Sequence, residues 1–139
     1  MEDKEQIQDR IRRHEGKRLK PYQDSQGNLT IGIGRNLSIT GISDDEAEYM
    51  FMNDLSDAVT KFNMLPEKVI KQCNLVRQEI LIEMIFQLGF DGILRFKKML
   101  SAIEAGDFIR AAGEIYNSLL MKQCRERAEE YYYRMKNGE

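Results

Sequence analysis

The chain has 139 residues, enough for one compact domain with a buried core and too few for two. Hydrophobic residues make up 42% of the chain and charged residues 32%, with a formal net charge of −2. This balance argues against a dedicated nucleic-acid-binding protein, which normally carries an excess of basic residues. No apolar run approaches the roughly 20 residues that span a bilayer, so we expect no stable membrane insertion.

The first residues of the chain, its two cysteines and its histidine bear on secretion, disulfide formation and metal binding. Residues 1–16 are charged throughout and have no apolar segment, so we expect no secretory signal. For a protein made in the cytoplasm, Cys73 and Cys124 are expected to be free thiols. The single histidine, His14, argues against a metal site. We therefore expect neither a metal nor a cofactor.

Two kinds of element are predicted before residue 43. Residues 3–14 carry Ile7 and Ile11 four positions apart, which is typical of a short amphipathic helix, and Gly16 is a suitable stop just beyond it. In residues 17–35, the turn cluster DSQGN separates two short apolar segments. That pattern predicts a β-hairpin.

The remainder of the chain has helical patterns. Ser43 and Glu46, three residues apart, form a capping box for a helix that is expected to reach about Phe62. The segment LVRQEILIEMIFQLG is apolar on most faces and is therefore expected to be a central, buried helix. The other predictions are a short helix from Pro66 to near Cys73, an Asn74 cap on the long helix, a break over 89–92, and helices at about 93–105, 107–120 and 124–136.

Together these elements predict an α+β fold that is mostly helical, in a single domain over residues 1–139. A small β-hairpin lobe, at about residues 15–42, is expected to pack against a larger helical lobe made of about 1–14 and 43–139. A junction of this kind favours a cleft between the lobes.

Two carboxylates and a hydroxyl within residues 15–30 are the candidate catalytic groups of the chain. Glu15 falls in the last turn of the first predicted helix, where the helix dipole disfavours a charged carboxylate and so suits a proton donor. Asp24 lies in the hairpin turn, where amides and hydroxyls can keep it ionised, and Thr30 could place its hydroxyl nearby. Such a set suits glycosidic hydrolysis by an acid/base pair. Spacing alone also allows Glu15 to be an exposed helix-end residue, Asp24 an ordinary turn former and Thr30 a strand residue without a catalytic role.

The segment HEGKRLKPYQDSQGNLTIGIG resembles the active-site stretch of the T-even phage lysozymes, the endolysin muramidases of glycoside hydrolase family 24. The resemblance continues through GISDDEAEYMFMNDLSDAV, LVRQEILIEMIFQLGFDGILRF and RERAEEYY, and so covers most of the chain in order. It implies a phage-lysozyme-like fold with its active cleft between the lobes. It also implies hydrolysis of the β-1,4 bond between N-acetylmuramic acid and N-acetylglucosamine in peptidoglycan, with inversion, for bacterial lysis.

The resemblance makes Glu15 the general acid, Asp24 the second catalytic carboxylate and Thr30 the third member beside it. We expect Glu15 to protonate the leaving oxygen while Asp24 and Thr30 orient a water on the opposite face of the sugar. An inverting pair of carboxyl groups should lie roughly 6.5–9.5 Å apart.

Further positions follow from the same resemblance. Asn36, Phe86 and Gln87 match positions that face the glycan, although Phe86 could equally be a core residue. Arg127 matches an arginine that pairs with the catalytic glutamate, and it could equally be a solvated helix charge.

The sequence also departs from the family. Arg35 replaces a histidine whose partner corresponds to Asp54, so we expect an Arg35–Asp54 ion pair that keeps its charge near pH 6. Met99 and Glu114 replace a small hydroxyl and an amide that bind saccharide. The connection over 36–42 is short, which predicts a trimmed β lobe.

The implied partner is the glycan strand of peptidoglycan. The implied protein is a monomer held in the host cytoplasm before it acts on the wall from the periplasmic side. One alternative is a non-catalytic cell-wall-binding or virion structural module on the same scaffold, which predicts loss of the catalytic set. Another is a lytic transglycosylase, which needs one acid and no water-positioning Asp. A DNA-binding domain is disfavoured by residues 44–59, which are acidic and lack any basic side chain.

Overall fold

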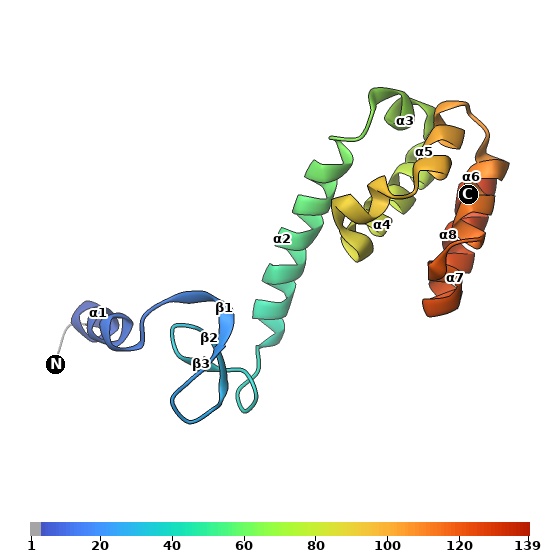
Figure 1. The fold of residues 1–139 in the computed structure, drawn as a ribbon. Helices are drawn as coiled ribbons and strands as arrows, with labels where there is room; N and C mark the ends of the chain where they lie inside the picture. The colour runs from blue at the N-terminus through green and yellow to red at the C-terminus, as the bar shows by residue number, and fades with distance from the viewer. Residues whose placement is uncertain (1–3) are drawn as a thin grey trace. The chain divides into compact units, whose positions relative to one another are not determined.

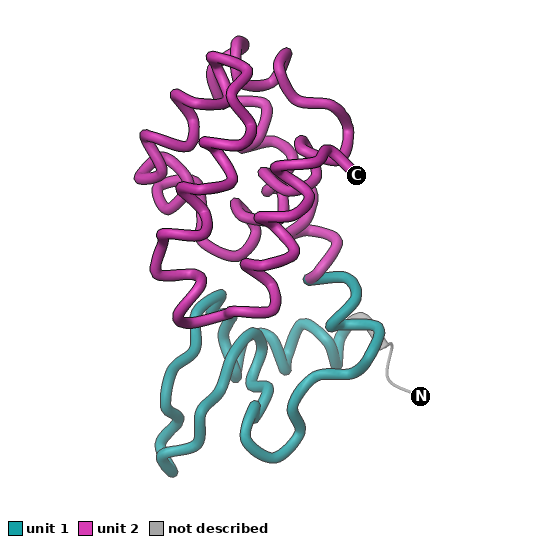
Figure 2. Tube along the Cα trace, turned by 90° about the vertical axis from the view of Figure 1, so that its right-hand side faces the viewer, with its two compact units in different colours: residues 1–50 teal, residues 51–139 magenta. Residues whose placement is uncertain are grey.

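The computed structural model describes residues 4–139 and divides into two compact units, Met1–Met50 and Phe51–Glu139 (Figure 2). The predicted class, α+β and mostly helical with a small sheet, is confirmed. The boundary falls inside helix α2 (Asp44–Phe62), which begins in unit 1 and continues in unit 2. A single domain over 1–139 stays a prediction.

Unit 1 begins with helix α1 (Lys4–Glu15), close to the predicted range; its predicted start at residue 3 lies outside the described residues. The helix ends at Gly16, whose N–H donates to the carbonyl of Arg12 at 2.8 Å. Gly16 has φ +70°, the left-handed conformation in which glycine closes a helix most readily. Glu15 is therefore the last helical residue.

The sheet of unit 1 is antiparallel, in the order β1 (Arg18–Gln23), β2 (Leu29–Gly32) and β3 (Arg35–Asn36) (Figure 1). The predicted hairpin is confirmed as β1 and β2, and β3 is a further strand that was not predicted. Gly32 and Gly34 both have φ near +70°, so the chain reverses again and the short β3 pairs with β2. Two residues are too few for an alternating pattern to reveal the strand.

Helix α2 starts at the predicted capping box. The amide of Glu46 donates to Oγ of Ser43 at 3.2 Å, and the amide of Ser43 donates to Oε1 of Glu46 at 3.0 Å. Two N–H groups that the helix start leaves unpaired are thus satisfied reciprocally. This contact also fixes the side chain of Glu46 at the start of the helix.

Unit 2 holds the rest of α2 and six further helices within the described residues. Asn74 caps α4 by accepting from the amide of Arg77 at 3.0 Å, as predicted. The six helices are α3 (Glu67–Gln72), α4 (Leu75–Leu94), α5 (Lys97–Glu104), α6 (Phe108–Tyr116), α7 (Leu119–Gln123) and α8 (Arg125–Asn137).

Three helix predictions need correction. The break predicted over 89–92 is confined to Gly89, whose φ of +78° interrupts α4, and the helix then continues to Leu94. The helix predicted at 93–105 accordingly begins only at Lys97. The one predicted at 107–120 ends at Tyr116, because Ser118 adopts an extended conformation and α7 starts after it.

The buried apolar core lies in unit 2 and is built around α4, as its apolar faces predict. Helices α6 and α8 run side by side and pack closely, and α5 packs on α6 (Figure 1). Tyr131 of α8 is buried within this core. Within residues 4–139, no helix combines the length and the apolar character that a membrane crossing requires.

Candidate active site

Glu15 and Gly34 lie in direct contact in unit 1. A Cβ atom added to Gly34 would stand 2.6 Å from Oε2 of Glu15 and 2.9 Å from its Cδ, distances at which atoms overlap. Gly34 also has φ +72°, a conformation that other residues adopt only with strain. The turn between β2 and β3 therefore accommodates the carboxylate of Glu15 because residue 34 has no side chain. No local pattern in the sequence predicts that these two residues meet.

Asp24 is held in the β1–β2 turn by three donors. Its Oδ1 accepts from the amides of Gln26 at 2.9 Å and Asn28 at 2.8 Å, and Oδ2 accepts from Nδ2 of Asn28 at 3.3 Å. The backbone amide of Asn28 contributes most to holding the pKa of Asp24 below its ordinary value, because this donor stabilises the charged carboxylate. Asp24 is therefore ionised at neutral pH.

Thr30 lies next to this network, in the central strand. The residue is only 3% exposed, and its hydroxyl donates to the carbonyl oxygen of Asn28 at 2.9 Å. Asp24 and Thr30 are thus linked through Asn28, which contacts both of them. Asn28 was predicted only as a turn former, because nothing in the sequence pattern indicates that it contacts both residues.

Asn36 is paired with Thr30 in the register of β2 and β3, so the two side chains are on the same face of the sheet. Its Oδ1 accepts from the amide of Ile39 at 3.0 Å, which orients the side chain. A contact between Asn36 and the glycan stays a prediction.

Arg35 has partners of its own in unit 1. Its Nη1 pairs with Oε1 of Glu46 at 2.9 Å and donates to the carbonyl of Gly41 at 3.1 Å, while its pairing with Asp54 of unit 2 stays a prediction. The capping box explains the contact with Glu46, since it turns the Glu46 carboxylate back toward the chain segment that precedes α2. The hydrogen bond from Arg35 is the main reason that the pKa of Glu46 falls to about 2.

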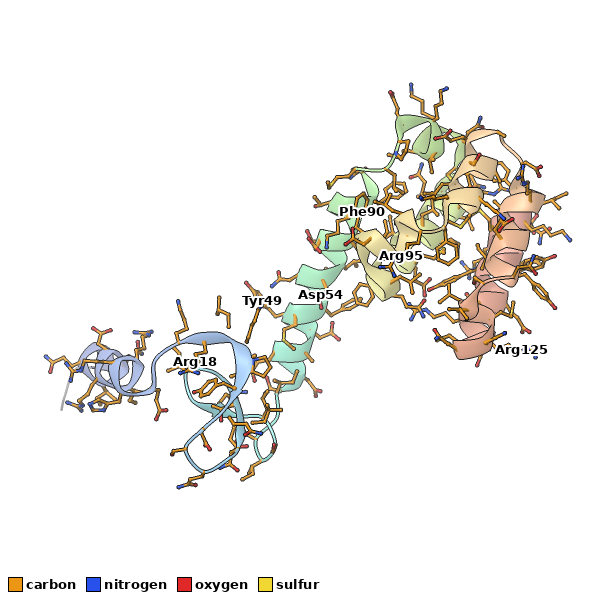
Figure 3. All side chains as sticks on the ribbon, in the orientation of Figure 1. Arg18, Tyr49, Asp54, Phe90, Arg95 and Arg125 are labelled. Carbon is orange, nitrogen blue, oxygen red and sulfur yellow. The ribbon has the colours of Figure 1, made fainter. Side chains whose placement is uncertain are left out.

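Unit 2 brings two other predicted site residues together. Asp54 of α2 (Figure 3) and Phe86 of α4 line one cavity of about 220 Å³, beside the kink at Gly89. Phe86 is 39% exposed and meets Phe51 edge to face, with ring centroids 5.8 Å apart. Phe86 is thus not a fully buried core residue in this structure.

Gln87 and Arg127 make contacts within unit 2. Gln87 accepts from the hydroxyl of Tyr131 at 3.1 Å and donates to Sγ of Cys124 at 3.5 Å, so both ends of its amide are engaged. Arg127 forms an ion pair with Glu83, at 3.2 Å, and its pairing with Glu15 stays a prediction. Glu83 lies on α4, which packs against the helix α8 that carries Arg127.

Met99 and Glu114, the two residues that replace predicted saccharide contacts of the family, also lie in unit 2. Met99 is fully buried and fills the core, so its side chain offers no polar group to a sugar. Glu114 lines a cavity of about 430 Å³ together with Arg95 (labelled in Figure 3). Within residues 4–139, no group of three or more histidine, cysteine or acidic side chains is arranged to hold a metal ion.

Comparison with known proteins matches residues 12–125 to the family described as Phage lysozyme. The chain is 30% identical to Probable T4-type lysozyme 1 of Dictyostelium discoideum, over 88% of this chain and 88% of that protein. It is 30% identical to the Endolysin of Salmonella phage P22, over 86% and 90%. It is also 34% identical to the Pre-baseplate central spike protein Gp5 of Enterobacteria phage T4, over 85% of this chain and 25% of that protein.

Proposed function

Because this chain belongs to the phage lysozyme family and is a muramidase that hydrolyses peptidoglycan, we propose an inverting mechanism in which Glu15 is the general acid. The bond cleaved is the β-1,4 linkage between N-acetylmuramic acid and N-acetylglucosamine. The observation that carries the proposal is that two turns of one small sheet contact or hold the two carboxylates. Its β2–β3 turn contacts Glu15, and its β1–β2 turn holds the ionised Asp24.

The hydrogen bonds around Thr30 define what the attacking water would meet. The hydroxyl hydrogen of Thr30 is already donated to Asn28, so toward a water molecule this oxygen can only accept. Asp24 is ionised and likewise accepts. A water that donates one hydrogen to each of them directs its lone pair away from both, toward the anomeric carbon of the sugar.

The reaction then balances in one displacement. Glu15 gives its proton to the glycosidic oxygen as the bond to the anomeric carbon breaks. The water oxygen forms the new bond from the opposite face and passes its proton to Asp24. An inverting pair needs room for this water, which places the two carboxyl groups roughly 6.5–9.5 Å apart. Asn36, Phe86 and Gln87 stay predicted glycan contacts.

We also propose a lytic role, in which a monomer held in the host cytoplasm reaches the wall from the periplasmic side. Support comes from the similarity to a phage endolysin. A second candidate role is a wall-cutting module of a virion, which is favoured by the similarity to a central spike protein.

The test is the loss of turbidity of purified peptidoglycan, followed by mass analysis of the released muropeptides. We expect Glu15→Gln to abolish activity while circular dichroism shows an unchanged fold. Glu104→Gln is the matched control, since Glu104 also ends a helix, α5, and is exposed. A folded Glu15→Gln protein that still releases muropeptides would refute the assignment. Anhydro-muramic ends would indicate a transglycosylase, and a wild-type protein that releases nothing would indicate a non-catalytic module.

A further inference from the structure

A cavity of unit 1, of about 570 Å³, lies between the sheet and the start of α2. Its volume is within the range of about 300–1,000 Å³ that is usual for small-molecule sites. Apolar side chains line it from the β2–β3 turn, from the segment before α2 and from α2 itself, among them Ile33, Ile42 and Met50. All three are partly exposed, so they present an apolar surface to whatever enters.

Tyr49 supplies an aromatic ring to this cavity. It projects from the first half of α2 (Figure 3), and 71% of its surface is exposed. A flat aromatic face of this kind contacts the C–H groups of a pyranose ring, because the ring offers apolar area while its hydroxyl remains free to hydrogen-bond. The methyl group of an N-acetyl substituent would match the apolar surface of Ile33 and Met50.

The polar groups of the cavity are few and held in place. Arg35 is fixed by Glu46 and Gly41 through Nη1, so the remaining N–H groups of its guanidinium are available as oriented donors. Asp45 also lines the cavity, and within residues 4–139 its carboxylate has no hydrogen-bond or ion-pair partner. Donors for a carbonyl oxygen and an acceptor for hydroxyls therefore border the same apolar surface.

The β2–β3 turn borders both the cavity and Glu15, the proposed catalytic acid. Ile33 lines the cavity, and the next residue, Gly34, contacts the carboxylate of Glu15. We propose that this cavity is a glycan subsite in which one N-acetylglucosamine unit stacks on Tyr49 and binds Asp45 and Arg35 through its polar groups. The proposal rests on the proposed function, because it assumes that a glycan strand reaches Glu15.

Charge selects N-acetylglucosamine over N-acetylmuramic acid at this position. The positive charge of Arg35 is neutralised by Glu46, which leaves Asp45 as the unbalanced charge of the cavity. N-acetylmuramic acid carries either a lactyl carboxylate or the acidic stem peptide, and both would be repelled by this carboxylate. N-acetylglucosamine is neutral and meets no such repulsion.

The test measures binding of peptide-free glycan strands, sorted by length, to full-length Glu15→Gln protein by calorimetry. Adding Tyr49→Ala should weaken binding of the octasaccharide about tenfold, the size expected from the loss of one aromatic contact. Binding of the disaccharide should change less, because a short ligand need not occupy this subsite. Tyr49→Phe keeps the ring and should retain most of the affinity.

Two further variants complete the design. Tyr133→Ala removes another exposed tyrosine, on α8 and outside this cavity, and should leave the affinity unchanged. Asp45→Asn should weaken the discrimination between the two sugars. Strands that place N-acetylmuramic acid in the cavity should then bind with an affinity closer to that of strands that place N-acetylglucosamine there. This second variant tests the subsite independently of any effect of Tyr49 on folding.

The failure of this proposal is distinguishable from failure of the proposed function. Activity that survives Glu15→Gln refutes the catalytic assignment whatever Tyr49 does. If Glu15→Gln is inactive but Tyr49→Ala and Asp45→Asn bind all strands like their parent, the subsite is refuted and the catalytic assignment stands.

Discussion

The carboxylate of Glu15 packs against the α-carbon of Gly34, so closely that even a methyl group on residue 34 would overlap with it. The end of α1 and the β2–β3 turn therefore meet at a point where a side chain on residue 34 would displace that of Glu15. Since Glu15 is the proposed proton donor, its position depends on a residue that takes no part in the chemistry. Gly34 is a positioning residue in this account.

Gly34→Ala is the substitution that tests this contact. It should cost about 1–2 kcal/mol of stability through the positive φ alone, and it should also displace Glu15 and lower kcat. The measurements are the free energy of unfolding by denaturant and the rate of peptidoglycan hydrolysis under conditions where the protein is folded.

Gly106→Ala is the control for backbone strain. Gly106 also has a positive φ, of +70°, but a Cβ there would meet only an ordinary contact at 3.7 Å, with Gln72 in unit 2. The two variants should lose similar stability, and only Gly34→Ala should lose activity. Equal activity of the two folded variants would contradict the positioning role.

Thr30 gives a prediction about the hydroxyl alone. Thr30→Ser keeps the hydroxyl and should keep most of kcat, whereas Thr30→Val keeps the shape and should lower kcat about 100-fold, because the attacking water loses an acceptor. Steady-state kinetics on soluble peptidoglycan fragments, with thermal melting as the control for folding, separate the two. If the valine variant is folded and as active as the serine variant, Thr30 does not orient the water.

The Arg35–Glu46 pair predicts a particular dependence of stability on pH. In the folded protein the pKa of Glu46 lies at about 2, below its ordinary value of 4.5, so the ionised carboxylate stabilises the fold above pH 4.5. That contribution is lost as the pH falls toward 2. The difference in Tm between wild type and Arg35→Met should therefore be constant from about pH 5 to 8 and shrink below 4.5.

This experiment also distinguishes arginine from the family histidine. A histidine loses its charge near pH 6.5, so a pair built on it would weaken across neutrality, whereas arginine stays charged. A Tm difference that changes between pH 5 and 7 would contradict the assigned pair. Glu46→Gln should reproduce the Arg35→Met profile.

Local signals in the sequence were sufficient for much of the fold. The Ser43–Glu46 capping box and the Asn74 cap placed the starts of α2 and α4, because side chain and backbone partner lie within three residues. The apolar faces of α4 identified it as the centre of the core. The resemblance to a family, more than the spacing, singled out Glu15 and Asp24.

Tertiary pairings could not be predicted in the same way. Arg35 was expected to reach Asp54 by analogy with the family, but Glu46 competes for it because the capping box already holds that carboxylate in place. The contact of Glu15 with Gly34 depends on a turn with two positive φ values, which the sequence pattern does not specify uniquely. The break before Ser118 was missed because the apolar pattern runs through it.

The anomeric configuration of the first product shows whether the reaction inverts or retains configuration. Freshly released reducing ends can be followed by proton NMR before mutarotation equilibrates them. We expect the α-anomer first, because water attacks the face opposite the leaving group in a β-linked strand. If the β-anomer appears first, the reaction retains configuration, and the roles given to Asp24 and Thr30 are wrong.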